Sequence, residues 1–215
     1  MTLNLTPDEL LTTTRSVRKR LDLQREVPIE VIRECLEVAR QAPSGSNVQT
    51  WQFMIITDAD KRAAISEYYL RSYEDYAKSS FYKNRMKQSD EVRVATATRI
   101  NDSSRYLADH MAEVPVLVLC AIDSGSADLP ATNQAGLWGS LLPAAWSFML
   151  AARARGLGSS YTTLHLAYEK EISELLGIPE TVHQGALLPT AYYTGDTFRP
   201  AQRNPLDEVL HINSW

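Results

Sequence analysis

The chain has 215 residues, a hydrophobic fraction of 44% and a formal net charge of −4 at pH 7. This length and composition are typical of one globular domain with a sizeable core. The mildly acidic charge, without a basic stripe, excludes nucleic acid as an expected partner.

The first segment, residues 6–20, begins with the pattern of a helix start. Thr6 is predicted as the N-cap, Pro7 occupies the first turn, and Glu9 stands at the capping-box position. The helix is expected to run into Arg15-Ser16-Val17-Arg18, where two guanidinium groups and a hydroxyl within one turn could bind a phosphate. A solvated basic helix end is the alternative, and it is the favoured one for this motif in isolation.

The N-terminal leucines bear on the cellular location of the protein, and the two cysteines bear on whether it has a metal or thiol site. Polar residues separate the leucines, so the pattern is not that of a signal peptide and a cytoplasmic location is the default expectation. Cys35 and Cys120 lie in a helix pattern and a strand pattern without CxxC or histidine spacing. Both are predicted to be buried thiols, and we expect neither a metal site nor a thiol nucleophile.

Residues 42–51 form a loop rich in small and hydrogen-bonding side chains, Ala42-Pro43-Ser44-Gly45-Ser46-Asn47-Val48-Gln49-Thr50-Trp51. It lies between a helix predicted over residues 28–40 and a strand predicted over residues 52–57. Gly45 lets the backbone approach a ligand, and the polar side chains offer donors and acceptors in several directions. We interpret it as a binding loop for a flat heterocycle with polar edges. A helix-stopping loop accounts for these ten residues equally well.

Residues 60–99 have a helical pattern in which aromatic and charged side chains alternate. Such a mixture rarely forms a hydrophobic core. It favours a mobile lid over a binding site, whose aromatic rings stack on an aromatic ligand. An ordinary amphipathic surface helix is the alternative. A further helix is predicted over residues 101–113, and a buried strand over residues 116–122.

The longest apolar stretch, residues 135–152, predicts a central helix covered by a sheet on one side and by a second copy of the chain on the other. Glycine and proline interrupt this stretch and two arginines close it, so a membrane span is not expected. A hydroxyl-rich extended segment over 159–165, a helix over 168–176 and a strand over 185–193 follow. The apolar residues of the tail need a surface, which a partner subunit or the chain's own core would supply.

The order of these segments resembles the FMN-dependent nitroreductase family along nearly the whole chain. The motifs that carry the resemblance are Arg15-Ser16-Val17-Arg18, residues 42–51, Gly156-Leu157-Gly158, Leu188-Pro189 and Arg203-Asn204-Pro205-Leu206. Thr50 is a departure, since the family has proline before the tryptophan. The resemblance implies an α+β fold with a mostly antiparallel central sheet, flanking helices and a long central helix at a dimer interface. It also implies one domain over residues 1–215, with a helical lid insertion at about 60–99 and a C-terminal arm at about 199–215.

The same resemblance implies that a homodimer holds FMN. The FMN phosphate would bind residues from near both termini, namely Arg15, Ser16, Arg18 and Arg203. The second subunit would contribute Pro43, Ser44, Ser46, Asn47 and Gln49 to the isoalloxazine ring. Thr162, Thr163 and Leu164 would pass flavin N5, where a backbone N–H or a catalytic threonine hydroxyl donates a hydrogen bond.

The implied activity is reduction of nitroaromatics, quinones or related flat aromatic acceptors, with NADPH or NADH as the electron donor in a ping-pong cycle. The hydroxyl-rich residues 161–163 and the aromatic insertion also resemble the branch of flavin-dependent dehalogenases of halogenated tyrosines. In that branch a lid acid, a tyrosine and a lysine clasp an amino-acid zwitterion, and the matching residue types here are Tyr73, Glu74, Tyr76 and Lys78. A flavin-binding protein without turnover is a third hypothesis. The four histidines, His110, His165, His183 and His211, are expected to be structural or exposed rather than catalytic, and substrate contact is considered only for His165, which directly follows residues 162–164.

Overall fold

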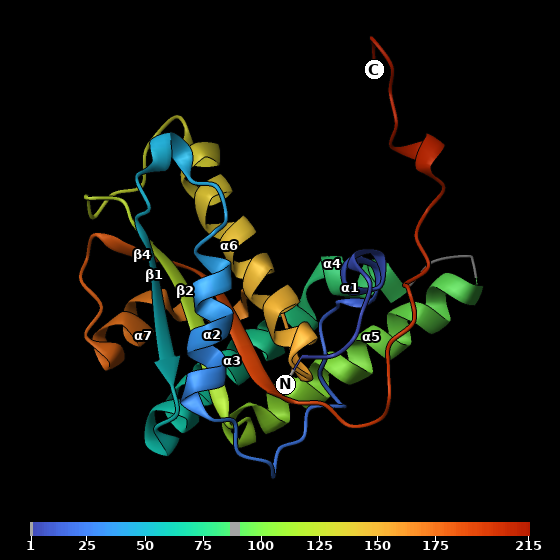
Figure 1. Ribbon diagram of the computed structural model, residues 1–215, viewed down its shortest axis with the longest axis horizontal. Coiled ribbons are helices and arrows are strands. Elements are labelled where there is room, and N and C mark those ends of the chain that lie inside the picture. Colours follow the sequence, from blue (N-terminus) through green and yellow to red (C-terminus); the bar gives the residue numbers. More distant parts are fainter. Residues whose placement is uncertain (1, 87–90) are drawn as a thin grey trace.

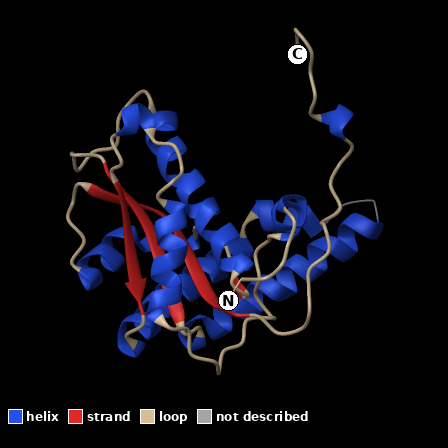
Figure 2. Ribbon diagram, in the orientation of Figure 1, coloured by secondary structure: helices blue, strands red, loops and turns tan. Residues whose placement is uncertain are grey.

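The computed structural model describes residues 2–86 and 91–215, and it consists of one sheet between two layers of helices (Figure 1, Figure 2). Four predicted lid residues, 87–90, lie outside the described residues. The helices are α1 (Pro7–Thr13), α2 (Ile29–Ala39), α3 (Ala59–Lys78), α4 (Ser80–Met86), α5 (Glu91–His110), α6 (Gln134–Ala154) and α7 (Glu169–Leu176). The strands are β1 (Trp51–Ile56), β2 (Val116–Asp123), β3 (Leu157–Ser159) and β4 (Val182–Tyr192). Four short 3-10 helices are η1 (Gly45–Asn47), η2 (Met111–Glu113), η3 (Leu164–Tyr168) and η4 (Leu206–Glu208).

The four strands form a sheet in the order β1-β2-β4-β3, and each neighbouring pair is antiparallel. The central strands β2 and β4 are buried over almost their whole length. Because helices cover both faces of the sheet, these strands read as continuous apolar runs rather than as alternating ones. The predicted α+β class with a mostly antiparallel central sheet is therefore confirmed.

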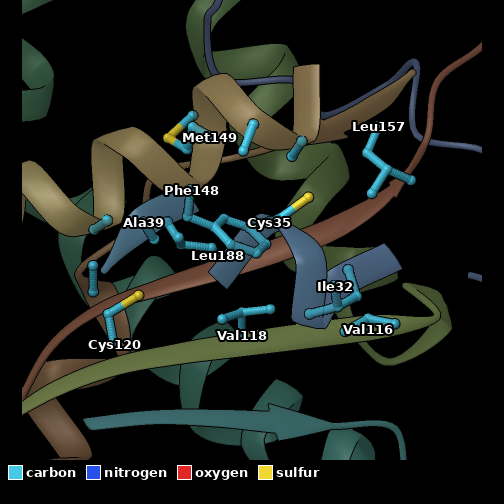
Figure 3. Packing of buried hydrophobic residues seen from close by; sticks show 14 of the residues in the cluster. Ile32, Cys35, Ala39, Val116, Val118, Cys120, Phe148, Met149, Leu157 and Leu188 are labelled. Carbon is cyan, nitrogen blue, oxygen red and sulfur yellow. The ribbon is translucent and has the colours of Figure 1, made fainter. Parts of the chain in front are cut away.

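Alternate residues of β2 enter two separate hydrophobic cores. Val118 and Cys120 face α2 and α6, where they pack with Phe148 and Leu188 (Figure 3). Leu119 faces the opposite way, toward the core that α3, α5 and α7 cover. The sheet thus holds α6 on one face and the predicted lid helices on the other.

The central helix α6 is only partly covered by its own chain. By length and composition it could cross a membrane, and 44% of its most apolar window is buried inside the protein. Its other side carries an apolar stripe in which Leu142 and Trp146 are 39% and 37% exposed. These two residues flank the middle of the 21-residue helix. Exposed apolar side chains that lie together on one helix face are common at protein contact surfaces.

Helix α1 ends at Thr13, earlier than the sequence predicts. The hydroxyls of Thr12, Thr13 and Thr14 each donate to the backbone carbonyl four residues back, an arrangement that weakens a helix end. Thr14 is already extended, with φ −69° and ψ 131°. Residues 15–18 therefore continue as extended chain instead of as a last helical turn.

The predicted boundary between two helices near residue 100 does not exist, because α5 runs unbroken from Glu91 to His110. Neither glycine nor proline occurs in this range, and the first strong helix breaker is Pro115. The Tyr73 hydroxyl donates to the Asn101 carbonyl at 3.3 Å, which ties α3 to α5. The two long helices of the lid region thus pack as one unit against the sheet.

Gly158 in β3 allows the N-terminal segment to pack directly on the strand. A Cβ at this position would lie 2.9 Å from Cβ of Val17 and 3.0 and 3.1 Å from its two methyl carbons, and Val17 is a buried and β-branched residue with little freedom to move. We expect Gly158→Ala to lower the free energy of unfolding by about 1–3 kcal/mol through overpacking. Urea unfolding of Gly158→Ala, Val17→Ala and the double variant measures this effect. The double variant should be more stable than the sum of the two changes predicts, and strict additivity would contradict the steric account.

Candidate functional site

A cavity of about 260 Å³ lies between α3, α5 and the segment that follows β3. Its walls are formed by Arg18, Tyr69, Tyr73, Tyr76, Ile100, Ser104, Tyr161, Thr162, Thr163 and Leu164. Six of these residues were predicted as cofactor or substrate contacts, and they come from three distant parts of the chain. Among the described residues of this wall, Arg18 is the only charged side chain.

The N-terminal segment reaches the cavity by pairing with the region after α6. Ser16 pairs with Ser159 as in a parallel ladder, and the Val17 N–H donates to the Ser159 carbonyl at 2.9 Å. The Ser16 hydroxyl accepts from the Tyr161 N–H at 3.1 Å. Arg18 then points to the cavity, where its Nη1 donates to Ser103 Oγ on α5 at 3.3 Å. Extended chain, not a helix end, thus places the predicted phosphate-binding residues.

Thr162 combines a fixed main chain with an enclosed hydroxyl. Its N–H donates to the Leu187 carbonyl at 3.1 Å, and its carbonyl accepts from the Leu187 N–H at 2.9 Å. Its Oγ1 is buried and makes no hydrogen bond within the described part of the chain. A buried hydroxyl without a partner is unfavourable, so a ligand atom in this cavity would stabilise it.

Three tyrosines of α3 share the cavity wall because residues 69, 73 and 76 follow the helical repeat. Burial raises the pKa of Tyr73 to about 12 and also raises the pKa of Tyr69. Both phenols are therefore protonated at neutral pH and can act as hydrogen-bond donors. Sequence reasoning missed Tyr69, although its spacing of four from Tyr73 was a signal that could have found it.

Glu74 and Lys78 lie on a different side of α3 from the cavity. Both are exposed, and Lys78 forms a 3.4 Å ion pair with Asp75 on the same helix. A 100° turn per residue separates position 74 from position 73, so the two predicted charged residues do not face the tyrosine wall. Of the four lid residues predicted to contact a substrate, the structure brings Tyr73 and Tyr76 to the cavity.

The loop of residues 42–50 lies beside the N-terminal part of α6 and has an unusual backbone. Ser46, Asn47 and Gln49 all have positive φ, at 49°, 56° and 54°. Such conformations cost free energy in residues other than glycine and occur often at ligand sites. Thr50 spares Gln49 the steric restriction that a following proline would impose. The Gly45 N–H donates to Ser140 Oγ at 2.9 Å, which fixes the loop beside the second turn of α6.

Within one chain, the loop of residues 42–50 and the start of the N-terminal segment are attached to different turns of α6. The N-terminal segment is attached near the C-terminal end, where the Leu3 N–H donates to the Ala154 carbonyl. Ala154 lies fourteen helical steps after Ser140, a rise of about 21 Å along the axis of α6. Pro43, Ser44, Ser46, Asn47 and Gln49 do not line the cavity at Thr162.

Arg15 and Arg203 are predicted to share a phosphate, and in the described residues Arg15 reaches only the start of the C-terminal arm. Arg15 Nη1 donates to the Arg199 carbonyl at 2.9 Å, four residues before Arg203. Arg203 is exposed and its Nη1 donates to the adjacent Gln202 carbonyl at 3.5 Å. The arm then extends away from the rest of the chain (Figure 1). A direct contact between the two guanidinium groups is not seen among the described residues.

A second cavity, of about 380 Å³, lies on the α6 side of the same segment. Tyr161 and Thr163 line both cavities, and Trp138 and Leu142 of α6 form part of the second wall. Segment 161–164 therefore separates a space under the lid helices from a space next to the exposed stripe of α6.

The sequence matches the Nitroreductase family over residues 11–192. The chain belongs to this family. A curated relative, the iodotyrosine deiodinase of Thermotoga neapolitana, is 27% identical over 188 residues, which are 85% of each chain. The predicted family is thereby confirmed, and the chain is also similar to an iodotyrosine deiodinase, a member of the halotyrosine branch that the sequence resembles.

Solved structures of nitroreductase-like proteins share the fold. A crystal structure of oxidised iodotyrosine deiodinase bound to FMN and 3-iodo-L-tyrosine has a TM-score of 0.68 at 23% identity, with 97% of this chain and 99% of that one covered. An FMN- and NADPH-dependent nitroreductase from Sphigopyxis sp. strain HMH has a TM-score of 0.71 at 19% identity, with 98% of this chain and 100% of that one covered. At these identities the likeness establishes the nitroreductase-like architecture.

His165, directly after the segment that lines the cavity in this nitroreductase-family chain, is fully enclosed. It does not line the two cavities that flank residues 161–164, and neither ring nitrogen has a hydrogen-bond partner in the described part of the chain. Burial lowers the pKa of His165 from 6.5 to about 3. The ring is therefore neutral and packed in the core at physiological pH.

This buried histidine predicts a pH-dependent stability. In the unfolded chain His165 takes up a proton below about pH 6.5, whereas in the folded chain it does so only near pH 3. The unfolded state thus binds more protons in this window, and stability falls as pH falls, by up to about 1.4 kcal/mol per unit. Urea unfolding at pH 6.5 and pH 5 should show a loss that is about 2 kcal/mol smaller in His165→Phe. The exposed His211→Phe serves as control, and equal pH dependence in all three proteins would refute the prediction.

Proposed function

We propose that this chain is an FMN-dependent oxidoreductase that reduces a small, flat aromatic acceptor with electrons from NADPH or NADH. The observation that carries the proposal is the cavity that joins Arg18, the unpaired hydroxyl of Thr162 and a wall of tyrosines. Family membership supports the same assignment.

The residues of the cavity fit FMN in charge and in hydrogen bonding. Arg18 offers a guanidinium for an anionic group, and Arg15 and Ser16 lie on the same extended segment. Thr162 offers a buried hydroxyl that lacks a partner, as the polar edge of a heterocycle requires. When bound, FMN would supply the ring that accepts and releases hydride. The threonine would stabilise charge on that ring, and the tyrosines would exclude water and stack on the acceptor.

We propose further that the complete site needs two copies of the chain. The cavity at Arg18 and Thr162 encloses about 260 Å³ in one chain, below the roughly 300–1,000 Å³ that ligand pockets occupy. A two-fold axis perpendicular to α6 near Leu142 and Trp146 would pair their exposed stripes in antiparallel orientation. That rotation would carry the partner's loop of residues 43–49 toward the Arg15 end of the first chain. The apolar C-terminal arm would gain a surface in the same assembly.

Reductive dehalogenation of a halophenol or halotyrosine is the second candidate, and the deiodinase relatives favour it. A zwitterionic amino acid needs both an acid and a base at the site. The described wall of the cavity holds Arg18 but no carboxylate, and Glu74 and Lys78 are exposed elsewhere on α3. This composition supports an acceptor without the amino-acid group.

The test uses purified protein loaded with FMN. It is incubated with a nitrofuran, with menadione and with iodotyrosine, each under NADPH, NADH and dithionite. We expect repeated NAD(P)H oxidation with the nitrofuran or menadione. Consumption of iodotyrosine alone would favour the dehalogenase, and a single reduction of the flavin without turnover would mean a flavin-binding protein.

A further inference from the structure

Arg153, in the last turn of α6, is a buried guanidinium to which the sequence motifs give no role. The residue is 3% exposed. Its Nη1 donates to the Tyr193 hydroxyl at 2.6 Å and its Nη2 donates to Thr197 Oγ1 at 3.4 Å, both neutral acceptors. None of the ion pairs within the described part of the chain includes Arg153. Burial of a cation against neutral acceptors costs free energy, so the stability of the fold does not by itself explain this residue.

Arg153 and Arg20 both hold residues 193–199, the arm root, which follows β4 and leads into the C-terminal arm. Arg20 Nη1 donates to the Thr197 carbonyl at 2.9 Å, and Arg153 Nη2 donates to the hydroxyl of the same residue. Both guanidinium groups also lie near the Phe198 ring, with Cζ at 4.2 Å and 5.1 Å from its centroid. The N-terminal segment and α6 thus fix the arm root together.

The arm root in turn holds Arg15, which is predicted to bind the FMN phosphate. Arg15 Nη1 donates to the Arg199 carbonyl at 2.9 Å, and Arg199 follows Thr197 by two residues. Arg15 is exposed, so its long side chain would lose rotamer freedom on binding an anion. An acceptor in a fixed position reduces that loss, because it restricts the side chain before the ligand binds. Contacts therefore connect Arg153 to Arg15 through the arm root.

We propose that Arg153 is a positioning residue for the phosphate end of the FMN site, and that it acts on Arg15 through the arm root. This inference rests on the proposed function and adds a residue to it. Arg153 does not line the cavity at Thr162, and its two terminal nitrogens are engaged by the arm root. Its effect should therefore be confined to the phosphate and should not extend to the flavin ring.

The test compares FMN with riboflavin, which has the same ring system and no phosphate, by quenching of flavin fluorescence on titration with protein. Arg153→Met should weaken FMN binding about three- to tenfold, the effect of about one hydrogen bond, and leave the riboflavin affinity unchanged. In an Arg15→Ala background the same change should have no further effect on FMN binding. Equal losses for both flavins would mean that Arg153 only supports the fold, and would overturn the inference.

Tyr193→Phe is the second variant, and it keeps the test decisive if Arg153→Met does not fold. It removes the hydroxyl that accepts from Arg153 and retains the aromatic ring. The expected result is again a loss of FMN affinity without a loss of riboflavin affinity. An FMN affinity equal to that of the wild type in the folded variants would overturn the inference.

Arg155→Met is the matched control, because Arg155 is a second cation at the same end of α6. It caps the helix and forms a 3.0 Å ion pair with Glu34 on α2 instead of contacting the arm root. Both arginines interact with the helix dipole, so a dipole effect would appear in both variants. Arg155→Met should leave the preference for FMN over riboflavin unchanged, and an equal loss in the two variants would overturn the inference. A wild-type chain that takes up neither flavin would overturn the proposed function as well, and the wild-type titration alone distinguishes this outcome.

Discussion

Replacing Arg18 with alanine is expected to weaken FMN binding by about 1.5–3 kcal/mol, a factor of about 10 to 150. The guanidinium borders the cavity at Thr162 and is held there by Ser103 Oγ. Hydrogen bonds to a charged group contribute more than neutral ones, so the loss should exceed that of one neutral hydrogen bond. Quenching of FMN fluorescence on titration with protein measures the affinity directly.

Lys19→Ala is the matched control for this experiment, since it removes the same charge one residue away. Lys19 is exposed and pairs with Asp102 instead of facing the cavity. It should change the affinity by less than about twofold, because exposed charges are screened by solvent and salt. Equal losses in the two variants would mean that Arg18 acts through overall charge, and an unchanged affinity in Arg18→Ala would remove it from the site.

Replacing Trp146 with glutamate is expected to separate the dimer and to release FMN in the same step. Trp146 lies near the middle of the exposed stripe of α6, where an isologous contact would bury it against its own copy. A tryptophan at the centre of an interface contributes at least about 2 kcal/mol, and two facing carboxylates would repel each other. Light scattering after size-exclusion chromatography measures the mass, and absorbance of the same peak measures bound flavin.

Leu175→Glu controls for the general cost of a new surface charge. Leu175 on α7 is 37% exposed, as Trp146 is, but α7 packs on the opposite face of the sheet. This variant should remain dimeric and yellow. A Trp146→Glu protein that stays dimeric, or a monomer that retains FMN at full affinity, would be inconsistent with a site shared across α6.

Local patterns in the sequence were sufficient to predict the strands and the central helix that form the core. The runs at β2 and β4 read as buried strands because helices cover both faces, and α6 reads as a covered helix because its apolar residues go almost all round. The capping box at Thr6 and Glu9 forms as predicted. These features depend on neighbours within a few residues, so one sequence contains enough information to predict them.

The features that sequence reasoning missed depend on contacts between distant segments. Residues 15–18 read as a helix end, but pairing with Ser159 makes them extended. Glu74 and Lys78 had the right chemistry for a lid, yet the phase of α3 relative to the sheet turns them outward. The same rotation of α3 about its axis places Tyr69 in the cavity wall. Packing of α3 against the sheet fixes that phase.

The most direct test of the shared site uses mixed dimers of two defective chains. One chain carries Arg18→Ala, and the other carries Ser44→Ala with Asn47→Ala in the loop of residues 42–50. Different affinity tags on the two chains allow purification of dimers that contain one of each. If each site takes Arg18 from one chain and the loop from its partner, every mixed dimer has one intact site and binds about one FMN, half the wild-type amount. Mixed dimers that bind no FMN, when both parent variants also bind none, would contradict the account.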